Sequence, residues 1–374
     1  MRVNGREMRE STVKDKFSMM RVIRPETLPM PNDERTRGYG RLRIRLAALA
    51  LAGVLAAGCA QLRDIFAPAV PGIPGEWAAL IEDVQAYERR IGFVATSNFY
   101  DLSEGQAPHT FCGVASRLAL PYSYEDPAIR WSESMTEAEC LALGRDADAY
   151  FGTVEALGEV ETPVTPAMID SRIDRFLYLV IHEDCHDQFE LPYGVEEALC
   201  NLITYKAMAE FSEQHYGPHA RESRAVQRYA EAESRTTRAT ISYYSQLAAL
   251  YARHERGELS VEGLMQARAA ILRRAERSLE WKRGELNNVA LATDMTYSRH
   301  YPLHERVHDA LGRDLARTVA FFKEVDRLKP APAAVMKRRR IASQSGVEFI
   351  RAYEAAVVET IQRELQAATG DGSH

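Results

Sequence analysis

The amino-acid sequence predicts a mainly α-helical fold with a small β element and several long helices. Apolar residues recur at helical spacing through most of the chain after residue 75. Residues that favour strands gather in one short stretch, Ala149–Val160, where glycines interrupt them. Prolines and glycines separate the apolar stretches, which predicts turns between successive helices.

The short elements are expected before residue 160. Residues 74–93 have helical spacing of their apolar side chains, and residues 93–128, rich in Ser, Pro and Tyr, are expected to be irregular. Thr136 and Glu139 are spaced as a capping box, so a short helix is expected over residues 135–144. One or two strands follow in the β-forming stretch.

The long helices are expected after residue 160. Thr165 is a good N-cap, Pro166 suits the first helical position, and "LPYG" (Leu191–Gly194) should end this helix. The rest of the chain predicts helices from Val195 onward, over about 218–256 and 260–283, within 286–297 and 302–325, and from Gly346 to about Ala367.

The N-terminal residues differ from the rest. A basic stretch, "RLRIR", precedes the apolar "LAALALAGVLAAG" and then Cys59, the order of a signal peptide. A Cys after "LAAG" resembles the lipobox of bacterial lipoproteins; the alternative is a secretory signal with an incidental Cys. We expect residues 1–58 to be an N-terminal extension and lipoprotein signal peptide. Cys59 would be lipidated and would anchor the chain in the bacterial cell envelope, facing the periplasm at the outer membrane.

Charge argues against nucleic acid as a partner. Residues 1–58 contain 12 Lys+Arg and 6 Asp+Glu, out of 47 and 53 in the chain, so residues 59–374 carry a net charge of −12. So acidic a chain is a poor candidate for binding a polyanion.

The stretch "HEDCH" (His182–His186) has the HExxH spacing of zinc peptidases. On a helix, residues four apart share a face, so His182 and His186 can approach one ion, and Glu183 can take a proton from a water beside it. The lead-in "FLYLVI" is apolar, and the next helix opens with Glu196 and Glu197, either of which could supply the third ligand. The alternative is a structural His pair on a buried helix.

A second match, "HERVH", occupies His304–His308. Pro302 precedes it closely and Arg306 puts a cation inside it, so we interpret it as an exposed polar helix start rather than a metal site. His300, His304 and His308 could bind metal only if one helix ran through all three.

The order of several stretches resembles the bacterial zinc aminopeptidase family. "HEDCHDQFELPYGVEEALCNLITY" is similar to that family's HELAH helix followed by its NESFA helix, and "LNNVALATDMTYSRHYP" to its LNNA stretch. The resemblance covers about residues 75–328. It implies a zincin-like metallopeptidase domain over 59–374, with its core at about 75–328 and a helical C-terminal tail over 329–374.

The resemblance also implies roles for individual residues. His182, His186 and Glu197 would bind zinc, Glu183 would be the general base, and Glu196 would be a rival ligand or hold the substrate ammonium. Tyr297 would donate a hydrogen bond to the oxyanion. Asn287 and Asn288, in the same stretch as Tyr297, would line the substrate site with it. Ordinary helix packing is the alternative for all three.

Four cysteines besides Cys59 allow two disulfides with three connectivities. Cys185 and Cys200 flank the expected zinc ligands and stand where the resembled family has Ala, so we expect a disulfide between them if the helices face each other. Cys112–Cys140 would be its companion. The alternatives are two buried free thiols, or Cys185 as an extra zinc ligand.

The expected function is therefore that of a Zn²⁺-dependent peptidase, an aminopeptidase, that hydrolyses peptide substrates at the cell envelope with Glu183 activating a water molecule. The alternative is a non-catalytic, envelope-anchored helical binding lipoprotein that retains a relic metal site, with the polar helices between residues 218 and 283 as its interaction surface.

Overall fold

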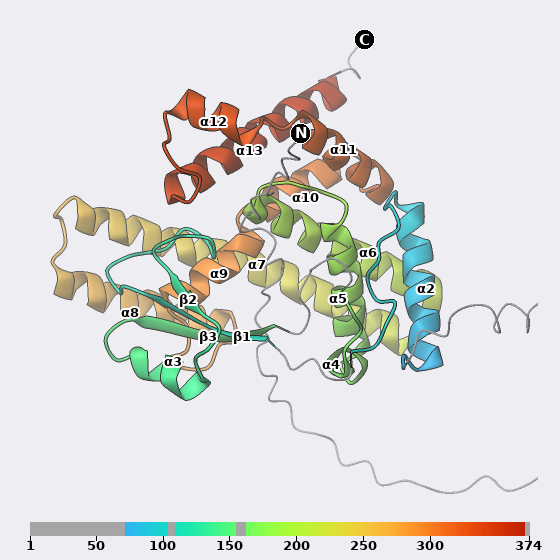
Figure 1. Ribbon diagram of the computed structural model, residues 1–374, viewed down its shortest axis with the longest axis horizontal. Coiled ribbons are helices and arrows are strands. Elements are labelled where there is room, and N and C mark those ends of the chain that lie inside the picture. Colours follow the sequence, from blue (N-terminus) through green and yellow to red (C-terminus); the bar gives the residue numbers. More distant parts are fainter. Residues whose placement is uncertain (1–71, 104–108, 155–161, 371–374) are drawn as a thin grey trace, which may run out of the picture.

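The computed structural model describes residues 72–103, 109–154 and 162–370. The expected signal peptide and Cys59 lie outside the described residues, as does the second half of the β-forming stretch. The described chain is mainly helical with one small sheet, as the sequence predicts (Figure 1). Within these residues, no helix combines the length and the apolar character required to cross a membrane.

The helices carry most of the chain. In chain order they are α2 (Gly75–Arg90), α3 (Glu137–Leu143), α4 (Pro166–Ile169), α5 (Ile173–His186), α6 (Tyr193–Tyr216), α7 (Arg221–Glu255), α8 (Val261–Ser278), α9 (Asn288–Ser298), α10 (Tyr301–Ala310), α11 (Leu315–Leu328), α12 (Pro332–Arg339) and α13 (Val347–Gly370).

The sheet has three antiparallel strands in the order β2-β1-β3. They are β1 (His109–Ala115), β2 (Arg130–Ser132) and β3 (Asp148–Val154). In the central strand Cys112 pairs with Phe151 on one side and with Ser132 on the other. The sheet packs against α9, and α3 lies beside it (Figure 1).

Two expectations from the sequence were wrong in detail. Residues 93–128 are not wholly irregular, because β1 lies within them. Its burial does not alternate strictly, and its last five residues are all buried, so the period-2 signal of a strand is absent. The helix expected from Thr165 is interrupted: Thr165 and Pro166 start the four-residue α4, and α5 begins only at Ile173.

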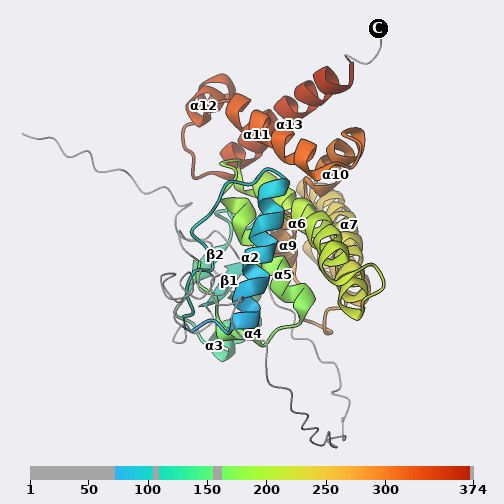
Figure 2. The same ribbon diagram turned by 90° about the vertical axis from the view of Figure 1, so that its right-hand side faces the viewer.

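Two large apolar clusters form the core. The first gathers side chains of α2, α5, α6, α10, α11 and α13, and the second those of α7, α8, α9 and the sheet. Viewed from the side, α2, α5 and α6 lie next to one another, and α11 to α13 lie across their upper end (Figure 2). Tyr193, at the start of α6, packs against the second cluster, although most of α6 lies in the first. The beginning of α6 therefore lies where the two clusters meet.

Candidate metal centre

Helices α5 and α6 carry the residues that converge. The turn between them contains Leu191 and Pro192, and Pro192 is the N-cap residue of α6. This short turn brings the first residues of α6 beside the last turn of α5, which holds the HExxH stretch. His182 and His186 are one helical turn apart on α5, so both imidazoles lie on the side that faces α6.

Three ligand atoms lie close together in the site. The Nε2 atoms of His182 and His186 are 3.3 Å apart, and Oε2 of Glu197 is 3.3 Å from the first and 3.4 Å from the second. Among the described residues, these three form the cluster of His, Cys, Asp or Glu side chains suited to hold a metal ion. Two imidazoles and one carboxylate are the ligand set of many catalytic zinc sites.

Glu196 and Glu197 have different places in the site. Oε1 of Glu196 is 3.0 Å from Nδ1 of His186, the ring nitrogen that faces away from the cluster. A carboxylate there makes Nδ1 the protonated nitrogen and leaves a lone pair on Nε2. The lone pair on Nε2 of His186 and the carboxylate of Glu197 then converge, and this arrangement favours a cation between them. Geometry therefore favours Glu197 as the ligand and Glu196 as the residue that orients His186.

The electrostatics of the cluster also favour a positive charge. Burial by itself raises the pKa of Glu197, but His186 and His182 outweigh burial and lower that pKa to about 2. Burial lowers the pKa of His186, but Glu197 and Glu196 outweigh burial and raise it well above its ordinary value. With no metal bound, a proton held on the imidazole would supply the cation that these carboxylates attract.

Glu183 is buried beside the cluster. Neither of its carboxylate oxygens has a hydrogen-bond partner among the described residues, which is costly for a buried polar group. Burial raises the pKa of Glu183 well above its ordinary value, and Glu197 raises it further against the lowering by His186. An unpartnered buried carboxyl next to a candidate zinc site is suited to accept and release a proton.

Two tyrosines border the ligands, and sequence reasoning identified only one of them. Tyr297 of α9 was expected; Tyr193 of α6 was missed. Burial raises the pKa of the Tyr193 hydroxyl, and Tyr297, which is hydrogen-bonded to it, and Glu197 raise it further. The Tyr193 hydroxyl therefore lies near the candidate ligand Glu197, and the Tyr297 hydroxyl lies next to that of Tyr193. The position of Tyr193, three residues before Glu196 in the "LPYG" turn, was the available signal.

His182 is held from behind by a third tyrosine. The ring of Tyr178, one turn earlier on α5, stacks on the His182 imidazole with 4.9 Å between centroids. Its hydroxyl donates to Oδ1 of Asn201 at 2.9 Å, and the Asn201 amide donates to the backbone carbonyl of Tyr297 at 3.3 Å. This chain of contacts connects α5, α6 and α9 directly behind the candidate ligands.

Asp184, two residues after His182, points away from the cluster. Asp184 is buried, and its Oδ1 accepts hydrogen bonds from the Thr96 hydroxyl at 2.5 Å and from the Asn98 amide at 2.9 Å. It is also hydrogen-bonded to Glu88 of α2. Asp184 thus docks α5 against its neighbours on the side away from the cluster.

The cysteines form two disulfides. Cys185 of α5 is bonded to Cys200 of α6, with 5.6 Å between their Cα atoms. Cys112 of β1 is bonded to Cys140 of α3. The first bond crosses between the two helices that carry the candidate ligands, one residue from His186 and three residues from Glu197.

The second HExxH stretch lies on α10, and among the described residues its histidines belong to no group that could hold a metal ion. We expected an exposed helix start, which is wrong, because both imidazoles are buried. Burial lowers the pKa of His304 to about 3, so its imidazole is neutral. Its Nε2 donates to the carbonyl of Val195 at 3.0 Å, because a carbonyl oxygen can only accept. Nδ1 of His308 donates to the Thr318 hydroxyl at 2.9 Å. These imidazoles pack α10 against α6 and α11.

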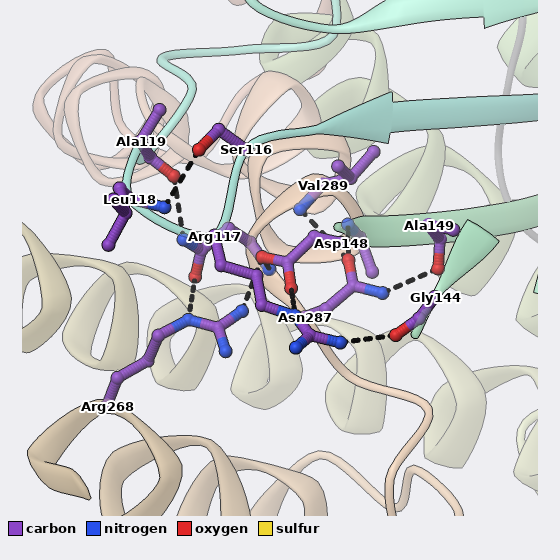
Figure 3. A network of polar contacts seen from close by, with 12 residues as sticks. Ser116, Arg117, Leu118, Ala119, Gly144, Asp148, Ala149, Arg268, Asn287 and Val289 are labelled. Atoms are coloured by element: carbon purple, nitrogen blue, oxygen red, sulfur yellow. Dashed lines mark hydrogen bonds and ion pairs between the residues drawn. The ribbon is translucent and has the colours of Figure 1, made fainter. Parts of the chain in front are cut away.

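Asn287 belongs to a polar network between α9 and the sheet (Figure 3), and the adjacent Asn288 is hydrogen-bonded to Asp148 of that network. Asn287 caps α9 and donates to the carbonyl of Ala149 in β3 at 2.7 Å. The backbone amide of Asn288 donates to Asp148, which also pairs with Arg268 of α8. Asn288 lies nine residues before Tyr297, about 14 Å along the helix. In the structure, the contacts of Asn287 and Asn288 dock helix α9 against its neighbours.

Comparison with known proteins gives one match. A family model described as "Putative aminopeptidase" matches residues 124–341, which is more than half of the chain and includes the whole candidate metal centre. No curated protein and no solved structure matches the chain.

Proposed function

The chain belongs to the putative aminopeptidase family, and we propose that it is a zinc-dependent aminopeptidase with its active site between α5, α6 and α9. The observation that carries this proposal is the convergence of His182, His186 and Glu197, whose three ligand atoms lie within 4.8 Å of one another beside an unpartnered buried glutamate. The family match supports the reaction class, and the side-chain geometry supports zinc as the cofactor.

The residues present fit a zinc ion, which His182, His186 and Glu197 would hold while Glu196 orients His186. When bound, zinc supplies a Lewis acid that polarises a peptide carbonyl and makes a water molecule acidic at neutral pH. The protein contributes the proton transfers. Glu183 takes the proton of the attacking water and passes it to the nitrogen of the departing amine.

The tyrosine hydroxyls would serve the carbonyl oxygen of the substrate. Tyr193 lies near Glu197 and its hydroxyl is hydrogen-bonded to Tyr297, and a phenol is a hydrogen-bond donor at neutral pH. Such a donor stabilises the negative charge that develops on the carbonyl oxygen in the transition state. We assign this role to Tyr297, with Tyr193 as its hydrogen-bonded neighbour.

An aminopeptidase also needs an acidic group for the substrate's ammonium. Glu196 is suited to this because its Oε1 faces His186, while its buried Oε2 has no hydrogen-bond partner among the described residues. One carboxylate would thus serve both the imidazole and the substrate amine. We further propose that Cys59 is lipidated and that the enzyme acts on peptides in the periplasm.

The test is hydrolysis of peptides with a free or an acetylated N-terminus by purified protein. We expect cleavage of the free peptide alone, loss of activity after zinc is removed with a chelator, and recovery when zinc is restored. Equal cleavage of the acetylated peptide would contradict an aminopeptidase but not a zinc peptidase. Activity that survives with no bound metal would contradict both.

The two neighbouring glutamates provide a matched pair of variants. Glu197→Gln removes a ligand and should abolish stoichiometric zinc binding. Glu196→Gln keeps the ligand set and should weaken zinc binding roughly 10–100-fold, as loss of a group that orients a metal ligand does. The opposite order of effects in zinc titrations would exchange the two roles.

A further inference from the structure

The C-terminal helix α13 contacts segments beside the candidate active site through one buried side chain. Glu354 is 1% exposed, although it lies on a helix that crosses the upper end of the molecule (Figure 2). It lies beyond residue 341, where the family match ends. A carboxylate is rarely buried to this extent unless it is paired, so its partners define its role.

Glu354 contacts three segments that are distant in sequence. Its Oε2 accepts a hydrogen bond from the Tyr122 hydroxyl at 2.7 Å, in the connection between β1 and β2. The same oxygen is 2.8 Å from Nε2 of His300, which precedes α10. Its Oε1 approaches Gly194 so closely that a Cβ at this position would be 2.5 Å away.

Each contact lies close in sequence to a residue of the proposed active site or to a neighbour of one. Gly194 is three residues before Glu197, and His300 is three residues after Tyr297. Tyr122 is two residues before Tyr124, whose ring is 6.2 Å from that of Tyr193. One carboxylate thus connects the segments that bring a zinc ligand, the candidate oxyanion donor and a neighbour of Tyr193.

The charges around Glu354 support a defined position. Gly194 is the second residue of the 24-residue α6, where the partial positive charge of a helix N-terminus attracts a carboxylate. Arg299 and Arg351 lie over the Tyr122 ring, 3.7 and 4.7 Å from its centroid, and Arg299 also donates to the Tyr122 carbonyl. These contacts hold the Tyr122 hydroxyl toward Glu354.

We propose that Glu354 is a positioning residue of the active site, which holds the first turn of α6, the Tyr122 connection and the start of α10 in register. This inference rests on the zinc site proposed above. It means that α13, which lies outside the family match, contributes to the site by fixing where Glu197 lies relative to the two histidines. Glycine at position 194 is required because the carboxylate occupies the space of a side chain.

The test is zinc affinity, measured on the full chain by competition with a chelator. Glu354→Gln should weaken zinc binding roughly tenfold, the lower end of the range for groups that orient ligands. Glu359→Gln is the matched control, because Glu359 lies on the same helix, is exposed and pairs with Arg338 and Arg339. It should leave zinc affinity unchanged.

A double-mutant cycle tests the contact with α6. Gly194→Ala should also weaken zinc binding, because its Cβ collides with Glu354. Glu354→Ala removes that collision, so the double variant should bind zinc no more weakly than Glu354→Ala alone, and the two effects should not add. Additive effects would overturn the proposed contact.

Two outcomes separate this inference from the proposed function. If wild-type protein binds no zinc, both fail. If wild type binds zinc and Glu354→Gln lowers thermal stability with unchanged zinc affinity, Glu354 only stabilises the fold and the inference alone fails. Should Glu354→Gln not fold, Tyr122→Phe, which removes one hydroxyl, takes its place and should weaken zinc binding in the same direction.

Discussion

The two HExxH stretches of this chain share the spacing of His and Glu but have different neighbours. On α5 the Nε2 atoms of His182 and His186 face each other and Glu197. On α10 the His304 imidazole is hydrogen-bonded to a backbone carbonyl, and the His308 imidazole is hydrogen-bonded to a threonine hydroxyl. The glutamates differ too: Glu183 is buried without a partner among the described residues, whereas Glu305 binds the exposed Arg238.

This difference shows that helical spacing creates a pair of imidazoles but not a metal site. The third ligand comes from another helix, and the turn after α5 is short enough to place it. Helix α10 instead packs its histidines against α6 and α11, where they satisfy other groups. Matched substitutions in the two stretches test this difference.

The largest effect is expected from the histidines. Replacing both His182 and His186 with Ala should reduce bound zinc from about one ion per chain to none, because only one ligand remains. His304→Gln should leave the zinc content unchanged, although it removes a buried hydrogen bond and should cost about 1–3 kcal/mol of stability. Elemental analysis of purified variants measures the first quantity, and thermal unfolding the second. Zinc retained in the double variant would exclude α5 as its site.

The glutamates should differ nearly as much in turnover. Glu183→Gln should keep zinc and the fold but lower kcat roughly 10²–10⁴-fold, the usual contribution of a general base. Glu305→Gln, at the same place in the other stretch, should leave kcat unchanged because Glu305 lies at the surface. Steady-state kinetics on a free peptide measures both. Unchanged turnover in Glu183→Gln would remove the assigned base.

The two disulfides offer a smaller and more selective contrast. Removing either with paired Ala substitutions should cost on the order of 3 kcal/mol of unfolding free energy. Only the Cys185→Ala/Cys200→Ala variant should also weaken zinc binding, because that bond joins the helices that carry the ligands. Denaturant unfolding and zinc titration of both variants separate the effects. Equal zinc affinities would show that packing alone holds α5 against α6.

The smallest effect is expected on the opposite side of α5, at Glu88. Burial raises the pKa of Glu88 well above 4.5, and the neighbouring Asp184 raises it further. An acid with a raised pKa in the folded state lowers stability as pH rises from its unfolded pKa to its folded pKa. Glu88→Gln removes this loss, so its melting temperature relative to wild type should increase between pH 5 and pH 8, by roughly 2 °C for 1 kcal/mol.

Glu82→Gln is the control for this pH effect, because Glu82 is exposed on the same helix. Its melting temperature relative to wild type should not change with pH. A constant difference between Glu88→Gln and wild type from pH 5 to pH 8 would contradict the raised pKa.

The amino-acid sequence by itself determined the helical class of the chain and the presence of a two-histidine pattern. Helical periodicity, the Thr136–Glu139 capping box and the breakers around "LPYG" depend on near neighbours, so local pattern is sufficient for them. Strand β1 escaped this reasoning because a strand buried on both faces has no alternating pattern.

Only the tertiary structure decided which histidines meet a third candidate ligand, and its geometry favours Glu197 over Glu196. Glu196 and Glu197 are adjacent in sequence, so their side chains leave α6 about 100° apart. As a result the Glu196 carboxylate meets Nδ1 of His186, whereas the Glu197 carboxylate meets Nε2 of His182. Glu354 is more than 150 residues from Gly194, so no local pattern could relate them. Contacts between distant segments depend on how helices pack, and that packing is set by the whole core rather than by any one stretch.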